Sequence, residues 1–211
     1  MIFFHIFVPT TSHNAMKYLS FFILLFIGEL SVSAQHMFSR QFPFFNQLSS
    51  NEIFSIHQDR EGYFWIGTTN GLARYDGYQL NTFRTDYKNQ NLLTDNGITA
   101  INDNDLYVWI GTWKGLNLYN KQTCRITPFS DARLLDKVVD AITVDKDGNV
   151  WVSAGGMTYR CDSTAHIIKE YEVGNIQEGY AISNIYVDQQ KQLWAVGSRG
   201  IFRYEPETDS F

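Results

Sequence analysis

The chain has 211 residues, a formal net charge of −5 and 16% aromatic residues. Its basic residues form no cluster, and it contains no helix-turn-helix or RNA-binding motif, which argues against a nucleic-acid partner. Cys124 and Cys161 are its two cysteines, and they stand at different places within the repeats described below. A disulfide between them would be stable in an oxidising compartment, but two unpaired, buried thiols are the favoured interpretation.

The first 34 residues have the order of a secretory signal peptide. Lys17 precedes an apolar run over residues 18–28, and Val32-Ser33-Ala34 offers the small residues of a cleavage site. The apolar run is too short for a membrane span, which needs about 20 residues. We therefore predict export to the periplasm and a mature domain over residues 35–211 with no further membrane span. An uncleaved N-terminal anchor is the alternative.

After this segment a tryptophan recurs four times, and an aspartate stands six positions before each one. The tryptophans are Trp65, Trp109, Trp151 and Trp194, and the aspartates are Asp59, Asp103, Asp145 and Asp188. Glycines follow at repeated positions, namely Gly67, Gly71, Gly111, Gly115 and Gly200. A spacing in the low forties with strand-like content predicts an all-β fold, the β-propeller, with one blade for each repeat.

Each repeat predicts four antiparallel strands. In the first repeat Asp59 and Gly62 bracket the first turn, because an Asp side chain bonds the backbone two residues on and glycine accepts a left-handed conformation. The fourth repeat has Gln189-Gln190-Lys191 there, which predicts a different turn type. We expect blades over about residues 50–84, 97–129, 138–172 and 181–211. The repeat tryptophans are predicted to be core residues between neighbouring blades.

Residues 50–77 (SNEIFSIHQDREGYFWIGTTNGLARYDG) resemble the two-component regulator propeller repeat. The resemblance extends from Ser50 to the C-terminus and is most specific in the first two repeats. It implies the periplasmic sensor region of a hybrid two-component system of Bacteroidetes, which detects oligosaccharides derived from polysaccharides. Sensors of this family have seven-bladed propellers followed by a β-domain, a membrane helix and kinase domains. Four repeats therefore predict the N-terminal part of such a sensor, and Phe38–Phe45 resembles an isolated outer strand. Because an open arc of four blades leaves the faces of its first and last blades bare, we expect the mature chain to self-associate.

One tryptophan lies outside the repeat pattern. Trp113 stands in the second-to-third-strand turn of repeat two and is followed by Lys114, while Asn70 and Arg199 occupy the corresponding turns of repeats one and four. We predict these four residues as a ligand-binding set, because an exposed indole can cover a sugar ring while an ammonium group bonds its hydroxyls. Packing of Trp113 against a neighbouring loop, and ordinary solvated turns elsewhere, are the alternatives.

No catalytic motif is present, and His57 and His166 are isolated and predicted to fill strand positions. Asp145-Lys-Asp-Gly148 begins like a calcium loop but has Gly156 where that loop needs a glutamate. We expect no metal, no cofactor and no enzymatic activity. The favoured function is the sensing of an oligosaccharide. The alternatives are a secreted binding or scaffold module that assembles with copies of itself, and a propeller enzyme that acts on polysaccharide.

Overall fold

The computed structural model describes residues 42–85, 92–173, 182–198 and 200–211. The predicted signal peptide, residues 1–34, and the candidate site residue Arg199 lie outside the described residues. All described residues belong to one compact unit, Phe42–Phe211. Among them the helices are two short 3-10 turns, η1 (Phe45–Gln47) and η2 (Ala132–Leu134), so no described helix is long enough to cross a bilayer.

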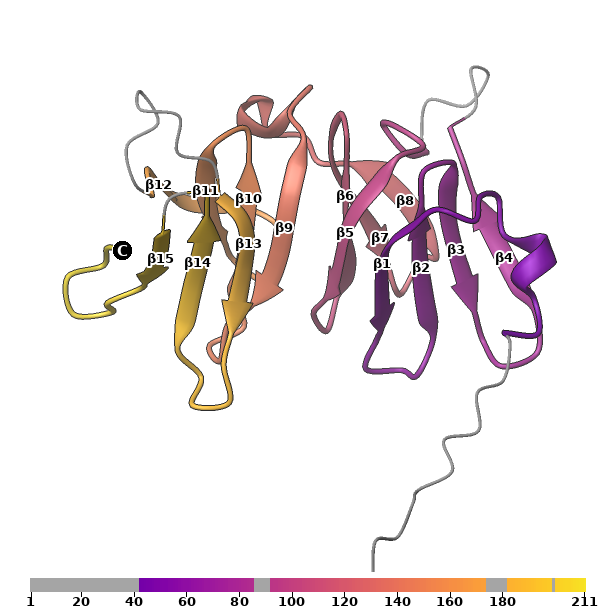
Figure 1. The fold of residues 1–211 in the computed structure, drawn as a ribbon, viewed down its shortest axis with the longest axis horizontal. Helices are drawn as coiled ribbons and strands as arrows, with labels where there is room; N and C mark the ends of the chain where they lie inside the picture. The colour runs from indigo at the N-terminus through magenta and orange to yellow at the C-terminus, as the bar shows by residue number, and fades with distance from the viewer. Residues whose placement is uncertain (1–41, 86–91, 174–181, 199) are drawn as a thin grey trace, which may run out of the picture. The chain divides into compact units, whose positions relative to one another are not determined.

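The strands form four antiparallel sheets that follow one another along the chain (Figure 1). Blade one contains β1 (Ile53–Gln58), β2 (Phe64–Thr68), β3 (Gly71–Tyr75) and β4 (Leu80–Phe83). Blade two contains β5 (Ile98–Asp103), β6 (Tyr107–Thr112), β7 (Gly115–Asn120) and β8 (Arg125–Pro128). Blade three contains β9 (Val139–Val144), β10 (Val150–Ala154), β11 (Met157–Cys161) and β12 (Ile167–Tyr171). Blade four contains β13 (Ile182–Val187), β14 (Leu193–Gly197) and β15 (Gly200–Arg203).

The blades are arranged as in a propeller, which confirms the predicted fold. The first strands β1, β5, β9 and β13 contact one another in that order. Hydrogen bonds join them, such as the one from Asn102 Nδ2 to the Ile142 carbonyl oxygen (3.2 Å). Blade four differs from the others, because β15 is followed by a turn that closes in a single bridge between Glu205 and Ser210 instead of a fourth strand.

The unit has an upper face and a lower face, at the two ends of its strands. The upper face carries the described turns between second and third strands and the described parts of the connections between blades, and the lower face carries the other turns of each blade (Figure 1). On the upper face the turns bond the connections directly. The Gly155 amide donates to the Val138 carbonyl (3.2 Å), and the Trp113 amide donates to the Gly97 carbonyl (3.1 Å).

The core lies between the blades. Trp65, Trp109 and Trp151 are at most 1% exposed, and each belongs to a cluster of buried side chains shared with the next blade. Trp194 has the same place in blade four and is only half-buried. Glycine is needed where the sheets approach most closely, because a Cβ on Gly67 would lie 2.7 Å from Ile98 Cγ2 of the next blade.

The aspartate before each tryptophan fastens the first turn of its blade to the indole. In blade one, Asp59 Oδ1 accepts hydrogen bonds from the amides of Glu61 (3.0 Å) and Tyr63 (2.9 Å). Its Oδ2 accepts from Trp65 Nε1 (2.6 Å). The same indole bond joins Asp145 to Trp151 and Asp188 to Trp194, each at 2.8 Å. A single side chain therefore orders both a surface turn and a core residue.

Blade two departs from this pattern. Its first turn is one residue shorter, and Asn104 rather than Asp103 accepts the turn amides of Leu106 (3.0 Å) and Tyr107 (2.8 Å). Asp103 points to the neighbouring blade instead, and the buried Trp109 Nε1 has no hydrogen-bond partner among the described residues. The expectation that Asp103 serves as the turn residue is therefore wrong.

The turn of blade four was predicted to differ, and it does not. Lys191 donates its amide to the Asp188 carbonyl (3.0 Å) as Gly62 does to Asp59 (2.9 Å). Lys191 also adopts the left-handed conformation of Gly62, with φ of 64° against 92°. The bonds to Asp188 impose the same turn on a residue that lacks the freedom of glycine.

Three smaller expectations also need correction. Phe42–Phe45, the described part of the predicted outer strand, forms a turn leading into η1, because the Phe42 and Phe44 rings pack on Tyr75 at 5.0 and 5.2 Å. Cys161 is buried, but Cys124 is exposed in a turn, and both are free thiols. His166 lies outside β12, in the preceding turn, where Asp162 Oδ1 accepts its amide.

Candidate functional site

Trp113 lies on the upper face, in the turn between β6 and β7. Its indole covers Gly97 so closely that a Cβ on that glycine would lie 2.4 Å from Trp113 Cε3. The side chain is nevertheless 43% exposed. One side of the indole therefore rests on the backbone of the preceding connection and the remainder faces solvent. The packing and binding interpretations of Trp113 are compatible with each other.

Phe54 of β1 lies beside Trp113 and is 56% exposed. The two ring centroids are 6.2 Å apart, with 63° between the ring planes. Phe54 occupies a β-bulge, since Ile53 pairs with Thr68 and Ser55 with Gly67 while Phe54 itself has no cross-strand partner. A bulge redirects a side chain from the regular alternation of a strand. Phe54 and Trp113, here called the aromatic pair, join neighbouring blades in one exposed apolar patch.

The other inner strands have a bulge at the same position, where they carry polar residues. Thr99, Asp140 and Ser183 occupy the bulges of β5, β9 and β13. Thr99 Oγ1 donates to the Val139 carbonyl (2.5 Å), whereas Asp140 and Ser183 are exposed. Desolvation by the neighbouring strands raises the pKa of Asp140. The starts of the four inner strands therefore carry, at equivalent positions, one aromatic ring, two hydroxyl groups and one carboxyl group.

The remaining residues of the predicted set differ in availability. Lys114 is exposed, and its ammonium group bonds no acidic group of the described chain. The Asn70 amide is engaged at both ends, because its Nδ2 donates to the Ser49 carbonyl (3.2 Å) and its Oδ1 accepts from Arg84. The structure thus leaves Trp113 and Lys114 free to contact a ligand, while Asn70 anchors the segment before β1.

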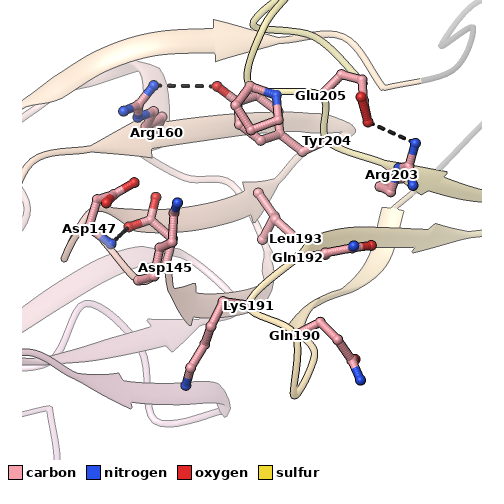
Figure 2. Close-up of a pocket in the computed structure, with 12 residues that line it drawn as sticks. Asp145, Asp147, Arg160, Gln190, Lys191, Gln192, Leu193, Arg203, Tyr204 and Glu205 are labelled. Atoms are coloured by element: carbon pink, nitrogen blue, oxygen red, sulfur yellow. Dashed lines mark hydrogen bonds and ion pairs between the residues drawn. The ribbon is translucent and has the colours of Figure 1, made fainter.

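A groove opens on the lower face between blades three and four, with a volume of about 390 Å³. The turns Asp145–Asp147 and Gln190–Gln192 form its walls together with β11 and β15. Figure 2 shows Arg160 and Tyr204 along one side and Lys191 with Gln190 along the other. Arg160 Nη1 donates to the Tyr204 hydroxyl at 3.5 Å, and its guanidinium carbon lies 5.6 Å from the centroid of Trp151.

Comparison with blade one explains why this groove is open. Arg74 has the place of Arg160, and the Tyr63 ring stacks on its guanidinium at 4.9 Å. Blade three has Asn149 in place of Tyr63, and this short side chain folds back to donate to Asp145 Oδ2 (3.0 Å). On the opposite wall, the equivalent position holds Lys121 in blade two and Pro206 in blade four. Two large side chains are therefore missing from the groove.

At the junction of blades one and two the same space holds an ion cluster. Asp103 accepts from His57 Nε2 (2.7 Å), from Lys121 Nζ (2.7 Å) and from the Arg60 amide (3.3 Å). Burial alone would raise the pKa of Asp103, but these hydrogen bonds outweigh it and lower the pKa from 3.8 to about 2. The cluster is nearly closed to solvent, with Asp103 4% and Lys121 7% exposed.

Sequence reasoning missed three of these features. Phe54 was predicted only as part of a buried inner strand on the bare face of the first blade, because a bulge cannot be located from strand periodicity. The match between Arg74 and Arg160, nine positions after Trp65 and Trp151, was a readable signal of equivalence. The ion cluster had none, since His57, Asp103 and Lys121 are far apart in sequence.

Comparison with known protein families gives a match in the first blade. Residues 47–70 match the family model described as two component regulator propeller. The chain therefore carries a two-component regulator propeller repeat. The matched segment of this repeat contains β1, the Asp59 turn, β2 and Asn70. The resemblance seen in the sequence is thus confirmed for the first blade. No curated protein matches the chain.

Solved structures with this arrangement of blades include extracellular domains of two-component systems. The extracellular domain described for the hybrid two-component system BT4673 of B. thetaiotaomicron has a TM-score of 0.60 and 22% identity, covering 73% of this chain and 21% of its own. That of BT3049 from the same organism has a TM-score of 0.52 and 20% identity, covering 82% of this chain and 31% of its own. The chain therefore spans between a fifth and a third of the length of these domains.

An enzyme shares the fold as well. Virginiamycin B lyase of Staphylococcus aureus has a TM-score of 0.59 and 18% identity, and the match covers 74% of this chain and 53% of the lyase. At this level of identity a likeness concerns the fold, which hosts many activities. The family-model match over residues 47–70, rather than the fold, is what relates this chain to two-component regulator propellers.

Proposed function

We propose that this chain is an exported ligand-sensing propeller of a two-component signalling receptor and that it binds an oligosaccharide on its upper face. The aromatic pair carries the proposal. Phe54 and Trp113 come from neighbouring blades, lie 6.2 Å apart and stay about half exposed. Binding sites combine apolar surface of this kind with a few polar groups that orient the ligand. The regulator propeller repeat supports the sensor assignment.

The chemistry of the upper face suits a sugar. A pyranose ring presents axial C–H groups that pack on the flat face of an indole, and its hydroxyls need donors and acceptors nearby. The Lys114 ammonium follows Trp113 directly, and the exposed bulge residues Asp140 and Ser183 supply an acceptor and a hydroxyl at the starts of the inner strands. Export to the periplasm is part of the proposal, and the signal-peptide pattern of residues 1–34 supports it.

The test is binding of the full mature chain to an oligosaccharide array, followed by calorimetric titration of the strongest ligand. We expect Trp113→Ala to weaken binding by about tenfold or more, because a buried aromatic anchor contributes about 2 kcal/mol to a complex. Tyr78→Ala is the matched control, since Tyr78 is 90% exposed but lies on the lower face in the turn between β3 and β4. It should bind like the unaltered chain.

Two results would contradict the proposal. One is an array without any ligand, or a ligand whose affinity Trp113→Ala and Tyr78→Ala change equally. The other is the release of new reducing ends from the bound oligosaccharide, which would assign an enzymatic activity to the propeller instead of a sensing role.

A further inference from the structure

We propose that the groove between blades three and four is a second binding site and that it takes a carboxylate or another oxyanion on Arg160, with Lys146 and Lys191 at its rim. This site is on the lower face and does not depend on the aromatic pair. Cationic side chains line the groove, a ring that closes the equivalent position in blade one is missing, and a carboxylate of the chain itself is bound beside Arg160.

The cationic groups of the groove are available, whereas two of its three carboxylates are not. Lys146 and Lys191 line the groove, and neither ammonium group bonds an acidic group in the part of the chain that is described. Asp145 is already bonded by four donors, two of them backbone amides and one the Trp151 indole. Glu205 is paired with Arg203 at 2.9 Å. The lining holds four cationic side chains against three carboxylates, which is a formal charge of +1 in a chain of net charge −5.

Arg160 is held in place, but its guanidinium group does not have all of its hydrogen bonds satisfied. Its guanidinium stacks over Trp151 from one side, and its Nε is buried without a hydrogen-bond partner in the described structure. Its bond to the Tyr204 hydroxyl is long at 3.5 Å, whereas the equivalent bond from Arg74 to Tyr119 measures 2.6 Å. A planar guanidinium fixed in this way is suited to a bidentate bond with a carboxylate.

The neighbourhood already binds one carboxylate. Asp209, in the turn after β15, accepts from Lys169 Nζ (2.6 Å), from the Tyr171 hydroxyl (2.6 Å) and from the Tyr204 hydroxyl (2.6 Å). Its Oδ1 lies 3.8 Å from Arg160 Nη1. Asp209 thus shows the preference of this cluster for an oxyanion, and Arg160 also lines the groove.

The groove is open because blade three lacks the ring that closes this position in blade one. Tyr63 stacks on Arg74, and Asn149 replaces it beside Arg160. Restoring the ring in Asn149→Tyr should therefore fill the groove while leaving every cationic group in the chain. This variant distinguishes a site from a mere accumulation of charge.

The experiment is a titration of the full mature chain with sodium glucuronate, with glucose as the uncharged probe and sodium sulfate as the second source of an oxyanion. We expect glucuronate or sulfate to bind and glucose not to bind. Binding of sulfate would identify a general oxyanion site, and binding of glucuronate alone would identify a site for a sugar carboxylate. Asn149→Tyr should abolish binding, and Lys191→Gln should weaken it by about two- to fivefold, as expected for an exposed charge.

The controls lie on the upper face. Lys114→Gln removes an exposed lysine at the opposite end of the blades, and Trp113→Ala removes the anchor proposed for the oligosaccharide, so both should bind glucuronate normally. If Trp113→Ala does not weaken binding of the oligosaccharide found on the array, the upper-face proposal fails, and the proposal for the groove still stands. The inference is overturned if glucose binds as strongly as glucuronate, if neither anion binds, or if Asn149→Tyr, with an unchanged melting curve, binds as well as the unaltered chain.

Discussion

At the scale of single residues, equivalent tryptophans of neighbouring blades differ by one hydrogen bond. Trp151 Nε1 donates to Asp145 (2.8 Å), whereas the Nε1 of the fully buried Trp109 has no partner in the described chain. A buried hydrogen bond to a charged group contributes about 1.5–3 kcal/mol, and an unpaired buried N–H costs about 1–3 kcal/mol. The two indoles therefore occupy equivalent positions in the core, but burial of Trp109 costs more free energy than burial of Trp151.

Replacement by phenylalanine should expose this difference. Trp151→Phe loses both volume and the bond to Asp145, whereas Trp109→Phe loses volume and also removes an unpaired donor. We expect the free energy of unfolding in urea to fall by about 1–2 kcal/mol more for Trp151→Phe than for Trp109→Phe.

A double-mutant cycle supplies the control for this comparison. Asp145→Asn should couple to Trp151→Phe, because the Trp151 indole donates to Asp145, and should be additive with Trp109→Phe, because the Trp109 indole does not. Equal losses of stability in the two tryptophan variants would show that the indole bond has no net value in this fold.

At the scale of single elements, the first turn of each blade shows how one geometry tolerates different residues. Gly62 and Gly148 adopt φ values of 92° and 83°, and Lys191 adopts 64° at the same place. A left-handed conformation costs a residue with a Cβ about 1 kcal/mol relative to glycine. Lys191 therefore carries a strain that the equivalent turns avoid, and its ammonium lines the groove on the lower face.

Lys191→Gly should therefore raise stability and lower anion binding in the same protein. We expect a gain of about 0.5–1 kcal/mol in the free energy of unfolding, measured in urea, together with weaker binding of glucuronate. Gly148→Ala is the mirror-image control and should lose a similar amount, because no atom lies within 4 Å of the added Cβ and only the backbone conformation is strained. A Lys191→Gly variant of lower stability would show that the lysine stem contributes packing that outweighs the strain.

The elements were largely predictable from the sequence, whereas the sites were not. Trp65, Trp109 and Trp151 define the period because each must fill the space between two blades, and so the fold followed from local pattern. The upper-face site was only half found, since Trp113 interrupts the pattern visibly but Phe54 depends on a bulge. The groove beside Arg160 is open because Asn149 replaces the ring of Tyr63 and Pro206 replaces the long side chain of Lys121. These two replacements lie on different blades, so neither repeat alone predicts a groove.

At the scale of the whole unit, the junctions between blades differ in chemistry. Blades one and two are joined by the buried cluster of Asp103, His57 and Lys121, whereas the groove at blades three and four is open. The outer sides of the terminal blades keep apolar side chains exposed, with Ile56 at 62% and Ile201 at 69%. Such surfaces favour association, and the self-association expected from the sequence stays a prediction.

Acid should weaken the junction of blades one and two. The pKa of Asp103 lies near 2 in the folded chain, below its usual 3.8, so the ionised carboxylate stabilises the fold. This contribution is fully present above about pH 4 and is lost as the pH falls from there through about 2. The change in pKa corresponds to about 2 kcal/mol.

The measurement compares unfolding of the unaltered chain and of Asp103→Asn between about pH 6 and about pH 2. The unaltered chain should be more stable at the higher pH, and the difference between the two proteins should shrink as the pH falls through this range. A difference that is independent of pH would mean that Asp103 acts by shape and neutral hydrogen bonding rather than by its charge.

The reorientation of Asp103 also determines which blades of this propeller could be transplanted into another propeller without losing hydrogen bonds. In blades one, three and four the aspartate serves its own blade, so the turn and the tryptophan would travel together if such a blade were transplanted. In blade two the aspartate serves blade one through His57 and leaves its own indole unpaired. A chimera built by moving blade two alone would keep the bond from Lys121 to Asp103 but lose the bonds from His57 and from the Arg60 amide. An exchange that preserves every bond of Asp103 must therefore move blades one and two together.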